Sequence, residues 1–286
     1  MKPGAAISTV VMAAGFAAAA SAVDFGNINL GDVQKVLGAT QKVATAMRDI
    51  SPQEETEIGR GMAAGLLGAA PLLDDAEAQR YVNRVGRWCA AQAGRPELQW
   101  RFGVLDDDDI NAFAAPGGYV FVTKGLLAVA GSEAELAGVL SHEIGHVIAK
   151  HHLNAIKNQA MQGLLGDLAG EALSGGKFNA APFIAGGMNL FAKGLDRKDE
   201  YEADRLGVVV ATRAGYEPYG LPRMLVKLGQ MNPQSSGLQL MTSTHPPASD
   251  RLARLQQLMS GGFERYGGQP LLEQRYAENL QHLFPR

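Results

Sequence analysis

Two histidines and a glutamate carry the clearest chemistry in the sequence, in the pattern His142-Glu143-Ile144-Gly145-His146. Residues four apart on a helix project from the same face, so both imidazoles can reach one metal ion. Glu143 borders that face, where a carboxylate can act as a general base. A catalytic zinc site usually combines three protein ligands with a water molecule, so the histidine pair needs one more ligand from elsewhere in the chain.

An acidic cluster at positions 200 to 204 can supply this ligand. Glu200 and Asp204 are four residues apart and share a face if the segment is helical. Glu200 can then complete the zinc shell, and Asp204 can support it. Glu202 is the competing candidate for the third ligand. The alternative to a metal site is a helix that carries ordinary surface histidines.

Four segments of the chain, in this order, resemble metallopeptidase family forty-eight. This gluzincin family includes CAAX prenyl endopeptidases, heat-shock-induced membrane proteases and periplasmic β-barrel assembly-enhancing proteases. The segments are NAFAAPGGYVFVTKGLL at 111–127, SHEIGHVIAKHH at 141–152, DEYEADRLG at 199–207 and STHPPASDR at 243–251. The resemblance covers roughly residues 51–260, and the soluble, stand-alone periplasmic branch is the most similar.

The resemblance implies a zinc metalloendopeptidase that binds one zinc ion per chain. Residue by residue, it makes His142, His146 and Glu200 the zinc ligands and Glu143 the general base. Asp204 becomes the hydrogen-bond partner of a ligating imidazole, a role that fixes the tautomer and orientation of the ring.

His245 and Arg251 lie in a segment that faces zinc in this family, and two roles for His245 stay open. As a donor to the oxyanion it would contribute to turnover, with Arg251 holding substrate backbone or the loop. As a fourth zinc ligand it would instead keep the resting protease shut until the loop moves. The structural alternative is a histidine that only caps a turn before Pro246 and Pro247.

The substrate is expected to lie as an extended strand along residues 119–123, at the edge of a sheet. Main-chain pairing at such an edge holds an unfolded segment without demanding a particular sequence. The predicted substrate-binding residues are Gly118, Tyr119, Val120 and Phe121.

This geometry favours cleavage of unfolded or damaged envelope proteins, which is a quality-control function. The alternative is a chaperone-like assembly factor for outer-membrane proteins that uses the same groove. Unfolded or extended polypeptides are therefore the expected partners, and the outer-membrane assembly machinery is a further candidate. The sequence makes no prediction of the oligomeric state.

The helices and strands expected around these residues indicate an α+β, mainly helical, zincin-like fold with a small sheet. Alternation of apolar residues indicates a strand at 99–105, and Gly117-Gly118 introduces a second strand at 119–123. The metal helix begins at the capping pair Ser132 and Glu135. Other helices are expected at 51–68, 74–94, 188–214 and 219–230, and from about 249, with Leu252, Leu255 and Leu258 facing inward.

The chain is expected to begin with a cleavable signal peptide at 1–22, followed by a loose arm at 23–50. The metallopeptidase domain then occupies 51–260, and a helical tail occupies 261–286. Within the domain, the Gly- and Ala-rich segment 160–194 is expected to form a flexible flap over the site. The signal predicts a periplasmic protein, with membrane association as an alternative.

Composition excludes some partners. The net charge is −3, from 26 basic and 29 acidic residues without a basic cluster, so nucleic acid is not an expected partner. Beyond the leader no run of about 18 apolar residues could cross a membrane. Cys89 is the only cysteine, which excludes an intrachain disulfide, and it is expected to be a small buried residue beside Trp88.

Overall fold

The computed structural model describes residues 49–161 and 178–284. The predicted signal peptide, 1–22, lies outside the described residues, as does the predicted arm except for its last two positions. Residues 162–177 in the middle of the predicted flap also lie outside them.

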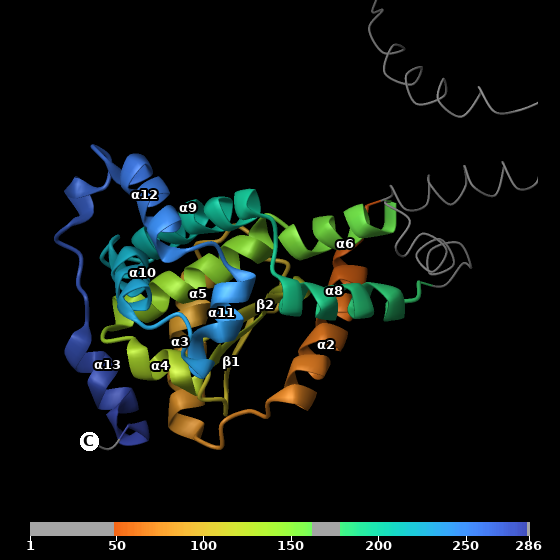
Figure 1. Cartoon of the computed structure of the whole chain (residues 1–286), viewed down its shortest axis with the longest axis horizontal. Coiled ribbons are helices and arrows are strands. Elements are labelled where there is room, and N and C mark those ends of the chain that lie inside the picture. Colours follow the sequence, from red (N-terminus) through yellow and green to blue (C-terminus); the bar gives the residue numbers. More distant parts are fainter. Residues whose placement is uncertain (1–48, 162–177, 285–286) are drawn as a thin grey trace, which may run out of the picture.

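The described chain is mainly helical, with one small sheet (Figure 1). The strands are β1 (Arg101–Leu105), β2 (Ala112–Ala115) and β3 (Tyr119–Thr123). The α-helices are α2 (Pro52–Ala69), α3 (Ala76–Ala90), α4 (Lys124–Val129), α5 (Glu133–Ile148), α6 (His151–Met161), α8 (Ala181–Lys193), α9 (Arg197–Arg213), α10 (Gly220–Gln230), α11 (Gln239–Thr244), α12 (Ala248–Met259) and α13 (Glu273–Leu280). The predicted α+β, mainly helical fold is confirmed.

Helix starts follow the capping residues of the sequence. At α2 a capping box forms, because the Ser51 hydroxyl accepts from the Glu54 amide at 3.3 Å and the Glu54 carboxylate accepts from the Ser51 amide at 2.9 Å. At α5 the Ser132 hydroxyl accepts from the Glu135 amide at 3.1 Å. The Glu135 carboxylate instead accepts from the Gly131 amide and from Lys227. The start of the metal helix is therefore tied to α10.

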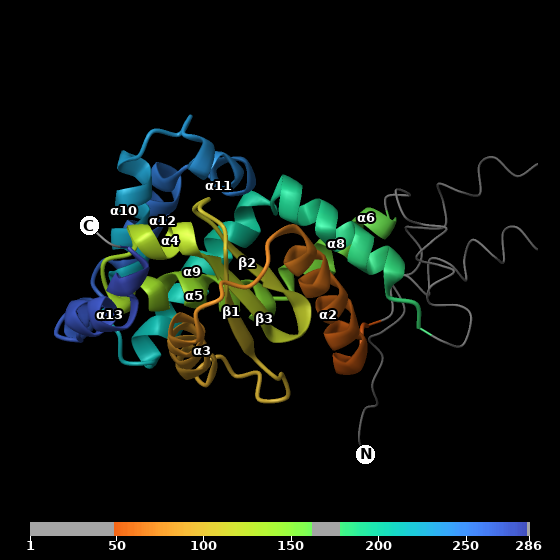
Figure 2. The same ribbon diagram turned by 90° about the horizontal axis from the view of Figure 1, so that it is seen from below.

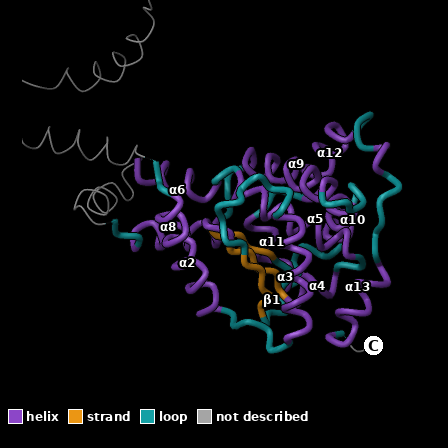
Figure 3. Tube along the Cα trace, turned by 180° about the vertical axis from the view of Figure 1, so that it is seen from behind, coloured by secondary structure: helices purple, strands orange, loops and turns teal. Residues whose placement is uncertain are grey.

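The sheet has the order β1-β3-β2, with β1 parallel to β3 and β2 antiparallel to it. Helices surround this short sheet (Figure 3). The prediction that 119–123 is an edge strand is wrong, because β3 pairs with a neighbour on both sides and has no free main-chain edge. The edge strand near the metal helix is β2, which the sequence analysis did not predict.

Helix α5 lies at the centre of the molecule, and every residue from 133 to 147 is buried. It packs against α9, α10, α3 and β2, and α9 runs beside it in Figure 1. The burial is this complete because other elements cover α5 on several sides. Burial of this kind restricts water around any chemistry that α5 carries.

The predicted helix at 188–214 is two helices in the structure. Helix α8 ends at Gly194, whose φ of 78° is a left-handed conformation that favours glycine, and α9 begins at Arg197. A Cβ at Gly194 would lie only 2.1 Å from the Thr244 carbonyl oxygen. The break thus brings the end of α11, and with it His245, close to the chain between α8 and α9.

The described part of the predicted flap is helical and packed. Pro182 stands in the first turn of α8 instead of breaking a helix, and α8 lies against α2 with Phe183 and Leu190 buried. Figure 2 shows α8 and α2 beside each other at one end of the sheet.

Two large apolar side chains are exposed at the surface, and one of them, Leu258, was predicted to face inward. Leu258 is 39% exposed, so only Leu255 of the three predicted inward leucines is fully buried. Trp88 is 58% exposed, although its indole N–H donates to the Ala214 carbonyl at 2.7 Å. Its neighbour Cys89 is buried as expected.

The C-terminal segment packs onto the domain. Tyr276 and Leu280 of α13 are buried in the main core, and the Tyr276 hydroxyl donates to the Leu127 carbonyl at 2.6 Å. Among the described residues, no helix has the length and apolar character needed to cross a membrane.

Candidate active site

Helix α5 presents two imidazole nitrogens to each other. The Nε2 atoms of His142 and His146 are 3.1 Å apart, and both rings are almost fully buried. Burial and neighbouring cationic groups lower the pKa of both imidazoles, so both are neutral near pH 7. A neutral imidazole is the form that binds a metal ion.

Helix α9 brings Glu200 to the same point. Its Oε2 lies 3.7 Å from His142 Nε2, its Oε1 lies 3.5 Å from His146 Nε2, and Oε2 has no hydrogen-bond partner although it is buried. Burial raises the pKa of Glu200 to about 8. The competing candidate Glu202 is half-exposed, and its carboxylate lies 3.6 Å from His151. Of the two acids, only Glu200 faces the histidine pair.

The outer nitrogen of His142 is held by a buried ion pair. Asp204 Oδ1 lies 2.9 Å from His142 Nδ1, and the Arg251 guanidinium donates to both Asp204 oxygens at 2.9 and 2.6 Å. Burial alone would raise the pKa of Asp204, but Arg251 and the His142 hydrogen bond lower it below its usual range. An ionised Asp204 fixes the proton of His142 on Nδ1 and leaves Nε2 free for a metal.

Two glycines allow α5 and α9 to approach closely enough for this contact. A Cβ on Gly207 would lie 2.9 Å from the backbone of His142, and a Cβ on Gly145 would lie 3.0 Å from the Ala203 carbonyl oxygen. The separation at Gly207 is shorter than real side-chain carbons show, and the one at Gly145 is tighter than most, so glycine at these positions favours the close approach of the two helices.

His245 approaches the same group of donors from the end of α11. Its Nε2 lies 3.7 Å from Glu200 Oε2, and its Nδ1 lies 3.0 Å from the Thr244 hydroxyl. His142, Glu200 and His245 offer ligand atoms that all lie within 4.8 Å of one another. Burial lowers the pKa of His245 to about 3, so this ring is also neutral.

Glu143 and strand β2 border a small cavity beside these donors. The cavity measures about 30 Å³ and is lined by Ala112, Phe113 and Ala114 of β2 together with Glu143, His146, Glu200, His245 and part of α8. A second cavity of about 20 Å³ adjoins Glu143, His142 and Arg251. Burial raises the pKa of Glu143 to about 8. The space next to Glu143 suits a water molecule and not a polypeptide.

The structure thus gathers His142, Glu143, His146, Glu200, Asp204, His245 and Arg251 at one place. The four predicted substrate residues are not part of this group. Gly118 belongs to the turn Pro116–Gly118, and Tyr119, Val120 and Phe121 belong to the central strand β3. None of these four lines the two cavities beside Glu143.

Sequence reasoning missed β2, because Ala112, Ala114 and Ala115 give little strand propensity. The turn Pro116-Gly117-Gly118 between two short apolar runs was the available signal, since such a turn often joins antiparallel strands. Two further histidines, His151 and His152, begin α6 directly after the metal helix. His151 lies 3.0 Å from the outer nitrogen of His146.

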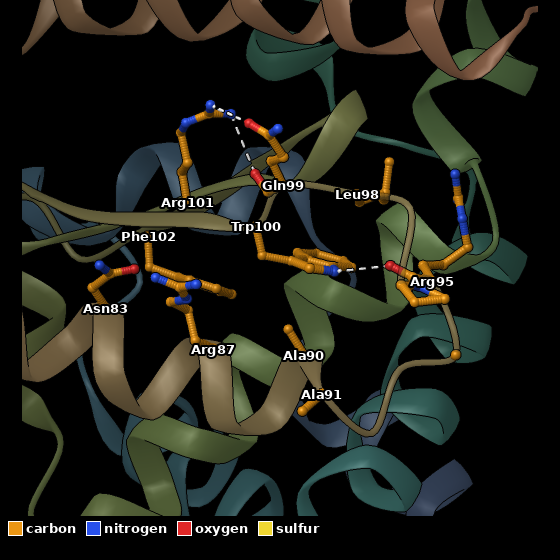
Figure 4. A pocket seen from close by; sticks show the side chains of 12 residues that line it. Asn83, Arg87, Ala90, Ala91, Arg95, Leu98, Gln99, Trp100, Arg101 and Phe102 are labelled. Carbon is orange, nitrogen blue, oxygen red and sulfur yellow. Dashed lines mark hydrogen bonds between the residues drawn. The ribbon is translucent and has the colours of Figure 1, made fainter.

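A wider cavity of about 790 Å³ lies between α3 and the segment that leads into β1 (Figure 4). The Trp100 indole N–H donates to the Arg95 carbonyl at 3.4 Å, and Arg101 donates to the Gln99 amide oxygen at 2.9 Å. Its lining contains no histidine and no carboxylate. The candidate residues for metal binding and proton transfer are therefore those around α5 and α9.

The model of "Peptidase family M48" matches residues 76–259. The chain belongs to this family. The resemblance inferred from the four sequence segments is thereby confirmed, and M48 membership places the chain among the metallopeptidases.

Several curated relatives are similar to this M48 chain. The "Beta-barrel assembly-enhancing protease" of Escherichia coli (strain K12) is 32% identical over 215 residues, which are 71% of this chain and 43% of that protein. The putative protein of the same name from Vibrio cholerae is 30% identical over 237 residues, or 79% of this chain and 46% of that one. The "Mitochondrial metalloendopeptidase OMA1" of Schizosaccharomyces pombe is 30% identical over 183 residues, or 62% and 52%. The matched region spans less than half the length of the two bacterial relatives.

Proposed function

We propose that this chain is a zinc-dependent endopeptidase in which His142, His146 and Glu200 hold one zinc ion and Glu143 is the general base. The observation that carries the proposal is the convergence of three buried donors, one of them a carboxylate oxygen without a hydrogen-bond partner. A buried polar atom without a partner is costly, and a cation relieves that cost.

The spacing of the donors fits zinc. Two ligands bonded at about 2.0–2.1 Å to a tetrahedral ion lie roughly 3.3–3.4 Å apart. The measured donor separations are 3.1, 3.5 and 3.7 Å. Two nitrogens and one carboxylate oxygen also match the ligand types of catalytic zinc sites.

The chain's own residues supply the proton transfers. When bound, zinc would lower the pKa of water toward about 7 and polarise the substrate carbonyl. Glu143 takes the proton of the attacking water and then delivers it to the departing amine. Asp204 and Arg251 keep the His142 ring in place, and the buried surroundings of α5 restrict bulk water.

Strand β2 is the better candidate for the substrate strand. It pairs with β3 on one side, lies at the end of the strand order and lines the cavity beside Glu143 with three of its four residues. An extended polypeptide can add to such an edge through main-chain hydrogen bonds, which favours unfolded segments. We assign substrate binding to β2 in place of Gly118 and β3.

The closed space around Glu143 favours a gating role for His245 over an oxyanion role. A polypeptide cannot enter a cavity of about 30 Å³, and the segment that carries His245 forms part of its wall. His245 also lies on the metal side of Glu200, where it could serve as a fourth ligand. Movement of this segment would both open the cavity and free a ligand position.

Replacing His245 with alanine is expected to raise the rate of casein cleavage. The variant lacks the imidazole that would occupy the fourth zinc position in the closed form. Initial rates at saturating casein, normalised to bound zinc, measure the effect. A fall of roughly 10²- to 10³-fold would instead support the oxyanion role. An unchanged rate would reject both roles and leave His245 as a turn residue.

We place this activity in the cell envelope, with unfolded or damaged proteins as substrates. The names of the bacterial relatives refer both to a protease and to β-barrel assembly. A chaperone-like assembly function is therefore the second candidate. Such a function needs the groove along β2 but no general base. The buried Glu143 beside the metal donors therefore favours the peptidase.

The direct test uses the purified full chain. It is expected to contain about one zinc ion, to cleave unfolded casein and to leave a stably folded protein intact. Removal of zinc with a chelator should abolish cleavage, and added zinc should restore it. Full cleavage by the chelated protein, or no zinc bound by the wild type, would overturn the proposal.

A further inference from the structure

The two histidine ligands are supported in different ways. His142 contacts a carboxylate, whereas the outer nitrogen of His146 faces another histidine. The Nδ1 atoms of His146 and His151 are 3.0 Å apart, and their rings are nearly perpendicular, with centroids 5.0 Å apart. Both rings are buried, so this contact is shielded from water.

The backbone between α5 and α6 creates this contact. Helix α5 ends at Ile148, and Lys150 adopts a φ of 56°, a left-handed conformation that residues with a side chain seldom use. The turn allows α6 to begin at His151 with its ring against His146. An unfavoured backbone conformation beside a candidate site marks a position that the surrounding structure holds in place.

Hydrogen-bond chemistry fixes which nitrogen atoms of His146 and His151 carry protons. If His146 binds a metal through Nε2, its neutral ring carries a proton on Nδ1. That proton can be donated only to an acceptor, so His151 Nδ1 must be unprotonated and the His151 proton must lie on Nε2. His151 Nε2 is buried without a hydrogen-bond partner, and the Glu202 carboxylate lies 3.6 Å away. A small movement of half-exposed Glu202 would let its carboxylate accept the proton on His151 Nε2.

We propose that His151 is a positioning residue for the His146 ligand, and that Glu202 selects the His151 tautomer. The inference rests on the proposed zinc site. His151 accepts the Nδ1 proton of His146 and so orients His146 Nε2 toward the ion, as Asp204 does for His142. Because an imidazole carries no negative charge, this support adds none to a site that already holds Glu143 and Glu200.

His152 provides a matched control. It is the next residue, it is also buried, and its ring packs 5.4 Å from the Phe191 ring and 5.9 Å from that of His146. Within the described part of the chain, no hydrogen bond joins it to His146. Loss of a buried ring can therefore be compared with loss of the hydrogen-bond acceptor.

The test measures zinc affinity by competition with a chelator. His151→Leu is expected to weaken zinc binding about 10- to 100-fold, and His151→Asn, whose side-chain oxygen can accept the His146 proton, should recover part of it. Glu202→Gln should have a smaller effect, and His152→Leu should leave the affinity near the wild-type value. The melting temperature of each zinc-free variant reports whether it folds. Zinc affinity in His151→Leu equal to that in His152→Leu would overturn the inference.

The tautomer can be measured in the wild type, which keeps the test valid if a variant fails to fold. Nitrogen-15 spectra of the zinc-loaded protein should show His151 protonated on Nε2 and His146 on Nδ1. A His151 proton on Nδ1 would refute the inference while leaving the zinc site intact. Failure of the zinc site itself would appear separately, as an unchanged zinc content in His146→Ala.

Discussion

Glu143→Gln is expected to retain one zinc ion and to lower the rate of casein cleavage by roughly 10²- to 10⁴-fold, the usual contribution of a positioned general base. Glutamine has nearly the same shape as glutamate, so the three proposed ligands stay in place. Its amide cannot accept the proton of the attacking water. Zinc content and casein turnover of the two proteins, measured side by side, give the comparison.

Stability gives an internal control for this variant. Burial raises the pKa of Glu143 to about 8 in the metal-free protein, above the value of about 4.3 expected in an unfolded chain. The folded state therefore binds more protons, and stability decreases as pH rises from about 4 to 8. Near pH 7 the zinc-free Gln variant should melt no lower than the zinc-free wild type. An unaltered cleavage rate in a folded variant would remove Glu143 from the mechanism.

Glu200→Ala is expected to lose both zinc and activity. Loss of a hydrogen-bond partner of a metal ligand can weaken zinc binding up to roughly 100-fold. The loss in Glu200→Ala should be larger, because a ligand itself is removed. The two nitrogens that remain, on His142 and His146, make an incomplete site. Chelator competition and bound-zinc analysis measure the effect.

Glu202→Ala is the matched control, since it removes a carboxylate from the same helix two residues away. Glu202 is half-exposed and turned toward His151 and Arg205 instead of toward the histidine pair. This variant should keep its zinc with at most a modest loss of affinity. The reverse result, zinc retained in Glu200→Ala and lost in Glu202→Ala, would transfer the third ligand to Glu202.

The helical period explains why so much of the site could be predicted. A spacing of four residues fixes a shared face, so His142 with His146 and Glu200 with Asp204 could be paired before any tertiary structure was considered. The structure brings the two pairs together as the resemblance implied. The capping pair Ser132 and Glu135 likewise predicted the start of α5.

Strand order could not be predicted in the same way. Ala112, Ala114 and Ala115 lack the β-branched and aromatic side chains that indicate a strand, so β2 was missed and β3 was mistaken for the edge. Which strand lies at the edge depends on pairing between separate segments of the chain. Strand β1 pairs in parallel with one side of β3, and β2 pairs with its other side. One unrecognised four-residue strand therefore changed which residues could pair with a substrate.

Tertiary contacts also decided what local signals left open. Gly194 separates α8 from α9 because its backbone meets Thr244, a residue from a distant part of the chain. The contact between His151 and His146 depends on the left-handed conformation of Lys150, for which a lysine gives no local signal. Both features lie beside the proposed zinc site.

The long sequence separations within the site set the order in which its residues become available during synthesis. Arg251 contacts Asp204 across 47 residues and His142 across 109 residues. A ribosome that adds about 5–20 residues per second would make Arg251 roughly 5–20 s after His142. Until then Asp204 lacks its guanidinium partner, although α3, α9 and α10, which pack on α5, have already been made. A chain that ends before Arg251 would therefore carry His142 and Asp204 without the guanidinium that orients the Asp204 carboxylate.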